Sequence, residues 1–358
     1  MLDHYNTTQK NFIRLWRKEK IMKVALYPGN FDPFHHGHAH IVNEAVKCGD
    51  YDKVVVCVTG IRDSWFDVAV KAEMARSYDL DPDKVEVDIW GPGGNMWWAQ
   101  EDITIVRGYR NQHDLDFEEE VRTAITEQTG YTEFRYFKAD CNERRLSSTK
   151  VRKAAETLDL AYLKEVVTPQ VITVLMERTL KAKLYVVCGR PASGKSTVLR
   201  EVAKVANVGI IKVDEVVADF KQLLREKFKT EDLVELVKTR EKEVAAFQGP
   251  LLLSRISELL LSMVGQYDVI LLECAYALKY QFDQYFGARM LFVDCTDFKG
   301  RNLKRGTPQH IHFAKTIPSY QDTKLFCNEN GIELKYFDNN DPITEVKMLD
   351  LFALLSED

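Results

Sequence analysis

The segment YPGNFDPFHHGHAH, residues 27–40, holds four histidines within six residues: His35, His36, His38 and His40. Such imidazoles can ligate a metal, bind phosphate, or serve only as loop and helix-start residues. Structural zinc usually draws its ligands from separate segments, and no cysteine pair accompanies the cluster. Gly29 and Gly37 let a ligand approach the backbone, and a helix starting near His38 would present its N-terminal amides at a sheet edge. The pattern favours binding of a nucleotide triphosphate.

A second stretch with chemical potential is GRPASGKST, residues 189–197, which fits the GxxxxGK[ST] pattern of a phosphate loop. An apolar strand-like run precedes it and a helix-like run follows. Its amides would hold nucleotide phosphates, Lys195 would contact the β and γ oxygens, and Ser196 would hold Mg²⁺. The predicted nucleotide-binding residues are Gly189, Arg190, Pro191, Ala192, Ser193, Gly194, Lys195, Ser196 and Thr197.

Apolar strand-like runs alternate with helix-like stretches along the chain, which is typical of parallel sheets built from βαβ units. The first series begins with KVALYPG and closes with a helix for which Thr168 is the expected N-cap and Pro169 the first residue. The second series restarts at KLYVVCG. We therefore expect an α/β protein with two Rossmann-like domains, at 21–180 and 183–358, after an extension at 1–20.

Composition narrows the classes of partner. A length of 358 residues exceeds one ordinary core, and a net charge of −5 gives no support for nucleic-acid or membrane binding. The seven cysteines are scattered and never form CxxC, which indicates a reducing, cytoplasmic setting. The apolar runs are of core-strand length. Basic and apolar residues mix in the first twenty, so an amphipathic helix or an organelle presequence remains open there.

Three motifs in the first half resemble a known family. GNFDPFHHGH resembles the (H/T)xGH signature of nucleotidyltransferases, whose second histidine contacts ATP phosphates. IVRGYRNQHDLDFE, residues 105–118, aligns without gaps with the RGxR and DxxYE segment of bacterial-type phosphopantetheine adenylyltransferases. LSSTKVR, residues 146–152, resembles that family's ISSS/TxxR nucleotide-binding segment. The resemblance implies adenylyl transfer from MgATP to 4′-phosphopantetheine.

Adenylyl transfer is an in-line attack on the α-phosphorus, so it requires positioning and hydrogen-bond donors and no covalent nucleophile. The resemblance implies that His35 and His38 are donors, and that Mg²⁺ neutralises the departing pyrophosphate. It gives cationic roles to Arg62, Arg107 and Arg110. The remaining residues implied for ATP are Asn30, Phe31, Gly108, Glu118, Ser147, Ser148 and Thr149.

Several of these positions carry an alternative interpretation. Glu118 is equally consistent with a helix cap. Met96 and Trp97, with Arg62, are assigned to the pantetheine arm, although core packing also explains apolar residues there. Asn30 stands where the family usually has Ser or Thr, Arg62 where lysine is common, and Phe117 where the family has Tyr.

The second half is similar to dephospho-coenzyme A kinases, through shorter motifs. Asp214 follows the strand GIIKV as a general base would, although an aspartate can also cap a helix there. Arg301 and Arg305 have the RxxxR spacing of that family's lid, but also suit solvated helix charges. Departures from the family pattern at Arg190, Pro191, Lys212 and ECAYALKY put the acceptor in doubt.

The order of the halves suggests a pathway, because the product implied by the first, dephospho-coenzyme A, is the substrate implied by the second. We expect a bifunctional coenzyme A synthase that uses ATP and Mg²⁺ and has small-molecule partners. Self-association through the first domain is left open. The alternatives are a nicotinamide mononucleotide adenylyltransferase fused to a ribosylnicotinamide kinase, a kinase of other specificity, and a non-catalytic nucleotide sensor.

Overall fold

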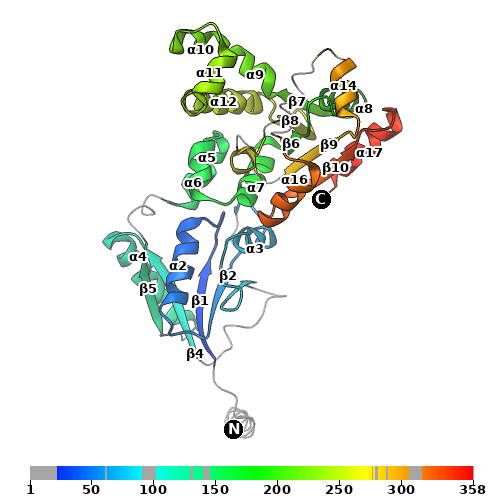
Figure 1. The fold of residues 1–358 in the computed structure, drawn as a ribbon. Coiled ribbons are helices and arrows are strands. Elements are labelled where there is room, and N and C mark those ends of the chain that lie inside the picture. The colour runs from blue at the N-terminus through cyan, green and yellow to red at the C-terminus, as the bar shows by residue number, and fades with distance from the viewer. Residues whose placement is uncertain are drawn as a thin grey trace, which may run out of the picture. The chain divides into compact units, whose positions relative to one another are not determined.

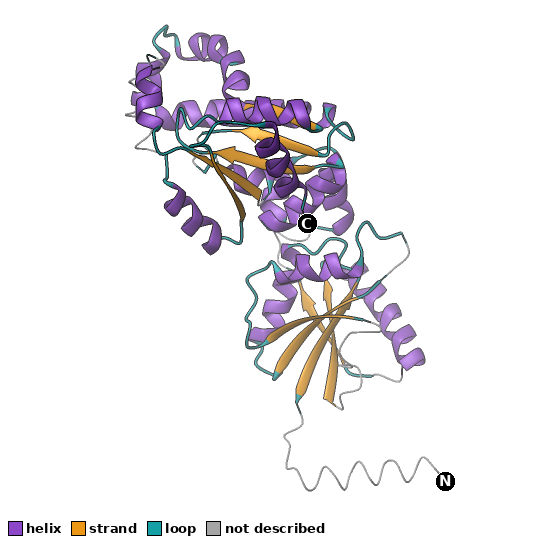
Figure 2. Ribbon diagram, turned by 90° about the vertical axis from the view of Figure 1, so that its right-hand side faces the viewer, coloured by secondary structure: helices purple, strands orange, loops and turns teal. Residues whose placement is uncertain are grey.

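A computed structural model describes most of the chain, in two compact units that divide after Ser148. The described residues are 22–60, 63–90, 102–129, 132–139, 146–275, 277–278, 281–287, 289–304, 306 and 317–357. Each unit contains a five-stranded parallel sheet with helices packed against it (Figures 1 and 2).

The first unit is built on a sheet of order β3-β2-β1-β4-β5. Its strands are β1 (Lys23–Gly29), β2 (Lys53–Val58), β3 (Val85–Ile89), β4 (Asp102–Tyr109) and β5 (Phe134–Lys138). Its helices are α2 (His36–Lys47), α3 (Val68–Arg76) and α4 (Gln112–Thr129).

Strand β1 lies at the centre of this sheet, with Val24 opposite Lys53 of β2 and Ile103 of β4. Val24 to Tyr27 are all buried, as expected for a strand covered on both faces. After β1 the chain adds β2 and β3 on one side of this strand, and then β4 and β5 on its other side. The strand order therefore reverses between β1 and β4. Ligands of such sheets bind outside the carboxyl ends of the strands at this reversal.

The second unit has a sheet of order β10-β9-β6-β8-β7. Its strands are β6 (Lys183–Cys188), β7 (Val208–Lys212), β8 (Val269–Glu273), β9 (Arg289–Asp294) and β10 (Glu333–Asp338). Its helices are α5 (Ser148–Glu156, beginning at the division), α6 (Leu160–Val166), α7 (Pro169–Leu180), α8 (Lys195–Val205), α9 (Val213–Asp219), α10 (Lys221–Phe228), α11 (Leu233–Thr239), α12 (Glu241–Ser262), α13 (Phe282–Phe286), α14 (Phe298–Lys304), α16 (Tyr320–Glu329) and α17 (Glu345–Ser356).

The two parallel sheets confirm the predicted fold class. The predicted start of α7 is also confirmed, because the Thr168 side chain accepts from the Val171 amide and Pro169 is the first helical residue. The expected start of α2 is wrong by two residues: the helix begins at His36, with His35 as N-cap. The imidazole of His38 therefore lies within the first turn.

The compact first unit ends earlier than the predicted domain boundary near 181–183. Helix α7 packs against strand β6 of the second sheet and against helix α13, with Val171, Ile172 and Leu175 fully buried. These contacts group residues 149–180 with the second unit. The assignment of α5 to α7 to the function of the first domain stays a prediction.

Helix α12 is, among the described residues, the one helix long and apolar enough to cross a membrane by length and composition. This is weak evidence, since core helices of globular proteins pass the same test. Val244, Leu252, Ile256 and Leu260 are buried against the protein. The sequence had suggested only apolar runs of strand length.

Candidate active sites

The loop after β1 forms an aromatic framework around His38. Phe31 has a positive φ of 47°, and its ring packs edge-on against Tyr27 and His38, with centroids 5.1 and 5.0 Å away. Phe34 lies 5.2 Å from the same imidazole. A Cβ atom at Gly29 would lie 2.6 Å from the Phe31 ring, so this close approach requires glycine. The packing fixes the orientation of His38.

His35 and His38 stack face to face, with ring centroids 3.7 Å apart and an interplanar angle of 16°. The backbone N–H of His35 donates to Nδ1 of His38 at 3.3 Å. A neutral imidazole has one donor and one acceptor nitrogen, so this bond leaves the proton of His38 on Nε2. His38 is therefore a hydrogen-bond donor through Nε2.

Both histidines are neutral at physiological pH. Burial, together with the smaller effects of the charges of His36 and Arg110, lowers the pKa of His35 from 6.5 to about 3. Burial also holds the pKa of His38 well below 6.5, with added repulsion from His35, Arg110 and Arg107. These histidines therefore offer N–H dipoles and no charge, and Arg107 and Arg110 are the cations whose charge acts on His38.

Arg107 and Arg110 are each held by a bidentate carboxylate. Arg107 donates from Nε and Nη2 to Glu118 at 2.5 and 3.1 Å, and from Nη1 to the Pro28 carbonyl at 3.0 Å. Arg110 donates from Nε and Nη2 to Asp114 at 2.6 and 3.2 Å. These pairs fix both guanidinium planes.

Both arginines have guanidinium N–H groups that these ion pairs do not use. Arg110 also donates from Nη1 to the Leu146 carbonyl at 3.1 Å, so each guanidinium uses three N–H groups. A guanidinium has five, which leaves about two on each residue for a ligand. Glu118 lies inside α4 and orients Arg107, so its interpretation as a helix cap is wrong.

The other predicted residues of the first site fall into three groups. Gly108 lets α2 approach β4, because a Cβ atom there would lie 2.8 Å from the Ile41 side chain. Ser148 donates its hydroxyl to the Pro33 carbonyl at 2.9 Å, whereas Thr149 belongs to the second unit and is exposed. Ser147, which directly precedes Ser148 in the chain, is partly buried. Arg62, Met96 and Trp97 lie outside the described residues.

A buried lysine that the sequence gave no reason to single out lies beside Asn30. Lys71 of α3 is 0 % exposed, and its Nζ donates to Asn30 Oδ1 at 2.6 Å and to the Thr59 carbonyl at 2.8 Å. Burial lowers the pKa of Lys71, and the charge of Asp32 opposes this shift. Lys71 thus joins the loops that follow β1 and β2.

In the second unit, the predicted phosphate loop connects β6 to α8. Gly189 has a φ of 133°, and a Cβ atom there would lie 2.2 Å from the Val293 carbonyl oxygen. Gly194 has a φ of 94°, and its Cβ would lie 2.1 Å from Nδ2 of Asn339. Side chains are excluded at both positions by conformation and by space.

Lys195 and Ser196 lie at the start of α8. Lys195 is 8 % exposed, and its Nζ donates to the carbonyls of Gly189 and Arg190 at 2.8 and 3.1 Å. Burial lowers the pKa of Lys195, while the charges of Glu273 and Asp214 oppose this shift.

Glu273 ends strand β8 directly opposite Ser196. The Ser196 hydroxyl donates to Oε1 of Glu273 at 2.7 Å, and Oε2 is buried without a hydrogen-bond partner among the described residues. A cavity of about 60 Å³ opens here, lined by Ala192, Gly194, Lys195, Ser196, Thr197 and Glu273. An oxygen-rich pair of this kind suits Mg²⁺.

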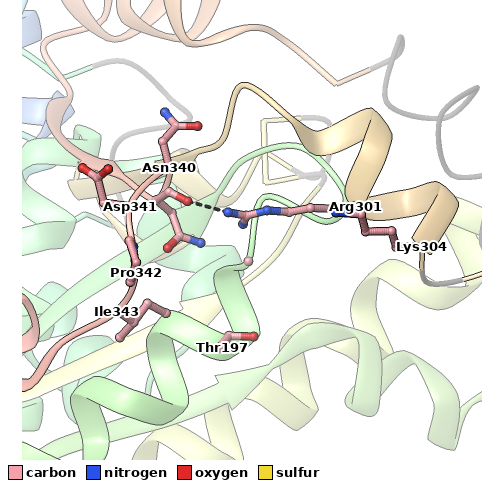
Figure 3. A pocket seen from close by; sticks show the side chains of 9 residues that line it. Thr197, Arg301, Lys304, Asn340, Asp341, Pro342 and Ile343 are labelled. Carbon is pink, nitrogen blue, oxygen red and sulfur yellow. Dashed lines mark hydrogen bonds between the residues drawn. The ribbon is translucent and has the colours of Figure 1, made fainter.

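A larger cavity of about 520 Å³ adjoins this loop (Figure 3). It is lined by Gly194, Thr197, Arg301, Lys304, Asn339, Asn340, Asp341, Pro342 and Ile343. Arg301 donates to the carbonyls of Asn339 and Ser193 at 2.8 and 3.4 Å, so it braces the loop from α14. It is therefore not a solvated helix charge. Arg305 lies outside the described residues.

Asp214 is exposed in the first turn of α9, whose N-cap is Lys212. Asp214 is therefore not the residue that caps this helix. Its assignment as general base stays a prediction.

Sequence reasoning missed three residues that shape these sites: Lys71, Asp114 and Glu273. A signal existed for Asp114, which lies four residues after Arg110 in a quoted motif, and for Glu273, which ends a buried strand at the sheet edge that carries the loops. Asn339 braces the loop by donating to the Ser193 carbonyl at 2.7 Å. No local pattern singles out Lys71.

Comparisons with known proteins match the first unit most closely. The Cytidylyltransferase-like family matches residues 26–154. The phosphopantetheine adenylyltransferase of Mycoplasma capricolum is 32% identical over 134 residues, which cover 37% of this chain and 96% of that enzyme. The enzyme of the same description from Moorella thermoacetica is 29% identical over 158 residues, or 44% and 98% of the two chains.

Among solved structures, a NadR protein in complex with NR aligns over 93% of this chain and 95% of its own, at 14% identity and a TM-score of 0.31. A score of this size carries no conclusion about fold or substrate.

Proposed function

Because the chain belongs, through its N-terminal part, to the phosphopantetheine adenylyltransferase family, we propose that its first unit transfers adenylyl from ATP to 4′-phosphopantetheine. The phosphate oxygen of phosphopantetheine attacks the α-phosphorus of ATP. The bond from the α-phosphorus to its bridging oxygen breaks, and pyrophosphate leaves. The observation that carries this proposal is the neutral, stacked pair of His35 and His38, which presents a fixed N–H donor beside two oriented arginines.

Each residue has a separate task in this proposal. Negative charge increases on the phosphoryl oxygens during transfer, and the Nε2–H of His38 stabilises that charge in a partly dehydrated site. Arg107 and Arg110 supply positive charge through their remaining N–H groups. Glu118 and Asp114 keep those groups in place before the substrate arrives, so little reorganisation accompanies the reaction.

The second unit is the proposed site of a kinase reaction, in which the 3′-hydroxyl of dephospho-coenzyme A attacks the γ-phosphorus of ATP and ADP leaves. Asp214 would accept the hydroxyl proton, and Lys195 would leave its two carbonyl partners to contact the transferring phosphate. The support is the loop between β6 and α8, where Lys195 Nζ donates to the carbonyls of Gly189 and Arg190 and the Ser196 hydroxyl donates to Glu273.

Magnesium fits the second site by the chemistry of its donors. Ser196 and Glu273 would hold the ion, because the buried Oε2 of Glu273 has no other partner among the described residues. When bound, Mg²⁺ neutralises charge on the phosphate oxygens. In the first reaction it would arrive with ATP.

The test is to incubate the full chain with MgATP and 4′-phosphopantetheine and to identify the products by mass. Coenzyme A supports both proposed reactions, and dephospho-coenzyme A alone supports only the first. Parallel incubations with nicotinamide mononucleotide and with ribosylnicotinamide test the alternative substrates. Efficient turnover of the mononucleotide would overturn the proposed acceptor, and nucleotide binding without any product would identify a sensor.

A further inference from the structure

Asn30 lies immediately after the central strand, where the sheet's strand order reverses. It is half-buried, and it directly precedes Phe31, whose ring packs on His38. Serine or threonine would offer one hydroxyl at this position, whereas an asparagine offers an acceptor on one side and two donors on the other. The direction in which the amide points therefore decides what it can bind.

Lys71 settles that direction. An ammonium group only donates, so the atom 2.6 Å from Lys71 Nζ must be the amide oxygen of Asn30. The Ser64 hydroxyl, which can donate or accept, donates to the same Oδ1 at 3.1 Å. With Oδ1 occupied twice, the NH₂ group faces away from Lys71, and it has no hydrogen-bond partner among the described residues.

The contacts of Lys71 match the three donors of an ammonium. Its neighbours are Asn30 Oδ1 at 2.6 Å, the Thr59 carbonyl at 2.8 Å and Ser64 Oγ at 3.5 Å. A lysine that is 0 % exposed loses its hydration, and these oxygens replace it. Asn30 is the nearest of the three, so the pair is held tightly.

We propose that Lys71 is a positioning residue for adenylyl transfer, which turns the Asn30 amide so that its NH₂ group donates to a phosphoryl oxygen of the bound substrates. The proposal rests on the proposed function of the first unit. Asn30 is then a substrate-contacting residue, and Lys71 acts through it. The phosphoryl oxygen belongs either to ATP or to phosphopantetheine, and the two KM values distinguish these sources.

The experiment is a double-mutant cycle in the full chain, with Asn30→Ala, Lys71→Met and the double variant. Asn30→Ala should lower kcat/KM for one substrate by about tenfold or more, as expected for the loss of a donor to a charged oxygen. Lys71→Met should cause a similar loss alone, but less than about a twofold further loss when Asn30 is already alanine. If the losses of the two single variants instead multiply in the double variant, Lys71 only holds the loops together, and the proposal is overturned.

Two further variants keep the test decisive. Asn30→Asp preserves the acceptor for Lys71 and removes the donor, so it should fold normally and show the loss of Asn30→Ala or more. Near-wild-type activity of that variant would refute the donor role even if Lys71→Met failed to fold. The matched control is Lys53→Met, which removes a lysine from the opposite end of β2, where it pairs with Glu86 at 3.2 Å.

A failure of the proposed function can be distinguished from a failure of the positioning role. If the wild-type chain forms no dephospho-coenzyme A, the reaction has been misassigned, and the same variants are compared by their Kd for a non-hydrolysable ATP analogue and for 4′-phosphopantetheine. Weaker binding of either ligand by Asn30→Asp, with the same non-additivity for Lys71→Met, would support the positioning role. Unchanged binding of both would overturn it.

Discussion

His38 can be dissected by two amide substitutions that each copy one ring nitrogen. In His38→Gln the amide group reaches the position of Nε2 and can keep the donor. In His38→Asn the shorter side chain reaches only the position of Nδ1, so it can accept from the His35 backbone N–H but offers nothing to the phosphate. If the Nε2–H carries the function, the longer amide should retain more activity than the shorter one.

The expected magnitudes follow from the two contacts. Loss of one preorganised donor to a developing oxyanion costs about 10²–10³ in kcat, or roughly 3–4 kcal/mol. The bond from the His35 amide is 3.3 Å long, so its loss in His38→Gln should cost about 1 kcal/mol or less of folding free energy. We expect His38→Asn to lower adenylyl transfer at least about a hundredfold, and His38→Gln to remain within about tenfold of wild type.

The assay is the rate of pyrophosphate release from MgATP and 4′-phosphopantetheine at saturating substrates, with the melting temperature measured for each variant. His40→Asn, the same substitution two residues further along α2, is the control. Equal losses in the two His38 variants would show that ring packing against Phe31 and Phe34 matters and the donor does not. A fully active His38→Asn would refute the reasoning altogether.

Three further predictions concern charge. From pH 7 to 5 the unfolded chain protonates His35 with a pKa near 6.5 while burial holds the folded value at about 3, so this residue alone should cost the first unit about 2 kcal/mol of stability, and His38, whose pKa burial also lowers, should add to that loss. Tryptophan fluorescence during urea unfolding reports on this unit, since all five tryptophans lie before residue 99. The His35→Asn variant should lose less of its unfolding free energy than wild type when the pH is lowered. Lys195→Ala should accumulate dephospho-coenzyme A by mass spectrometry, because the second reaction loses its phosphate contact and the first site is untouched; coenzyme A formation at the wild-type rate would contradict the assignment. Glu273→Gln, which keeps an acceptor for Ser196 but removes the charge, should raise the Mg²⁺ concentration for half-maximal kinase activity about tenfold or more; an unchanged Mg²⁺ requirement would exclude Glu273 as a ligand.

Local signals in the sequence predict the fold and the position of both sites. Buried runs such as VALY and VVVCV form interior strands because they are apolar on both faces, and glycine-containing segments follow β1 and β6, beside which the two sheets reverse their strand order. The spacing of His35 and His38 places both at one helix start. Asp114 follows Arg110 by four residues, so even this ion pair has a local signal.

Contacts between distant segments could not be predicted in this way. Lys71 lies 41 positions from Asn30, and Ser196 lies 77 positions from Glu273, so neither pair leaves a periodic pattern. The sequence around Lys71, VAVKAEM, suggests an exposed lysine on an otherwise apolar helix. Its burial becomes evident only when α3 packs beside the loops after β1 and β2. The protonation states of the histidines likewise depend on packing, because burial is what lowers their pKa values.

The pairing of Arg107 with Glu118 and of Arg110 with Asp114 also bears on how substrates arrive. Each guanidinium charge is cancelled at long range by its own carboxylate, and the whole chain carries a net charge of −5. An anionic nucleotide approaching by diffusion therefore meets no attractive field from these arginines and experiences their N–H groups only on contact. Added salt screens the overall repulsion, so it should leave the association rate unchanged or raise it slightly, in contrast to the steep decline seen where an exposed basic funnel steers the ligand.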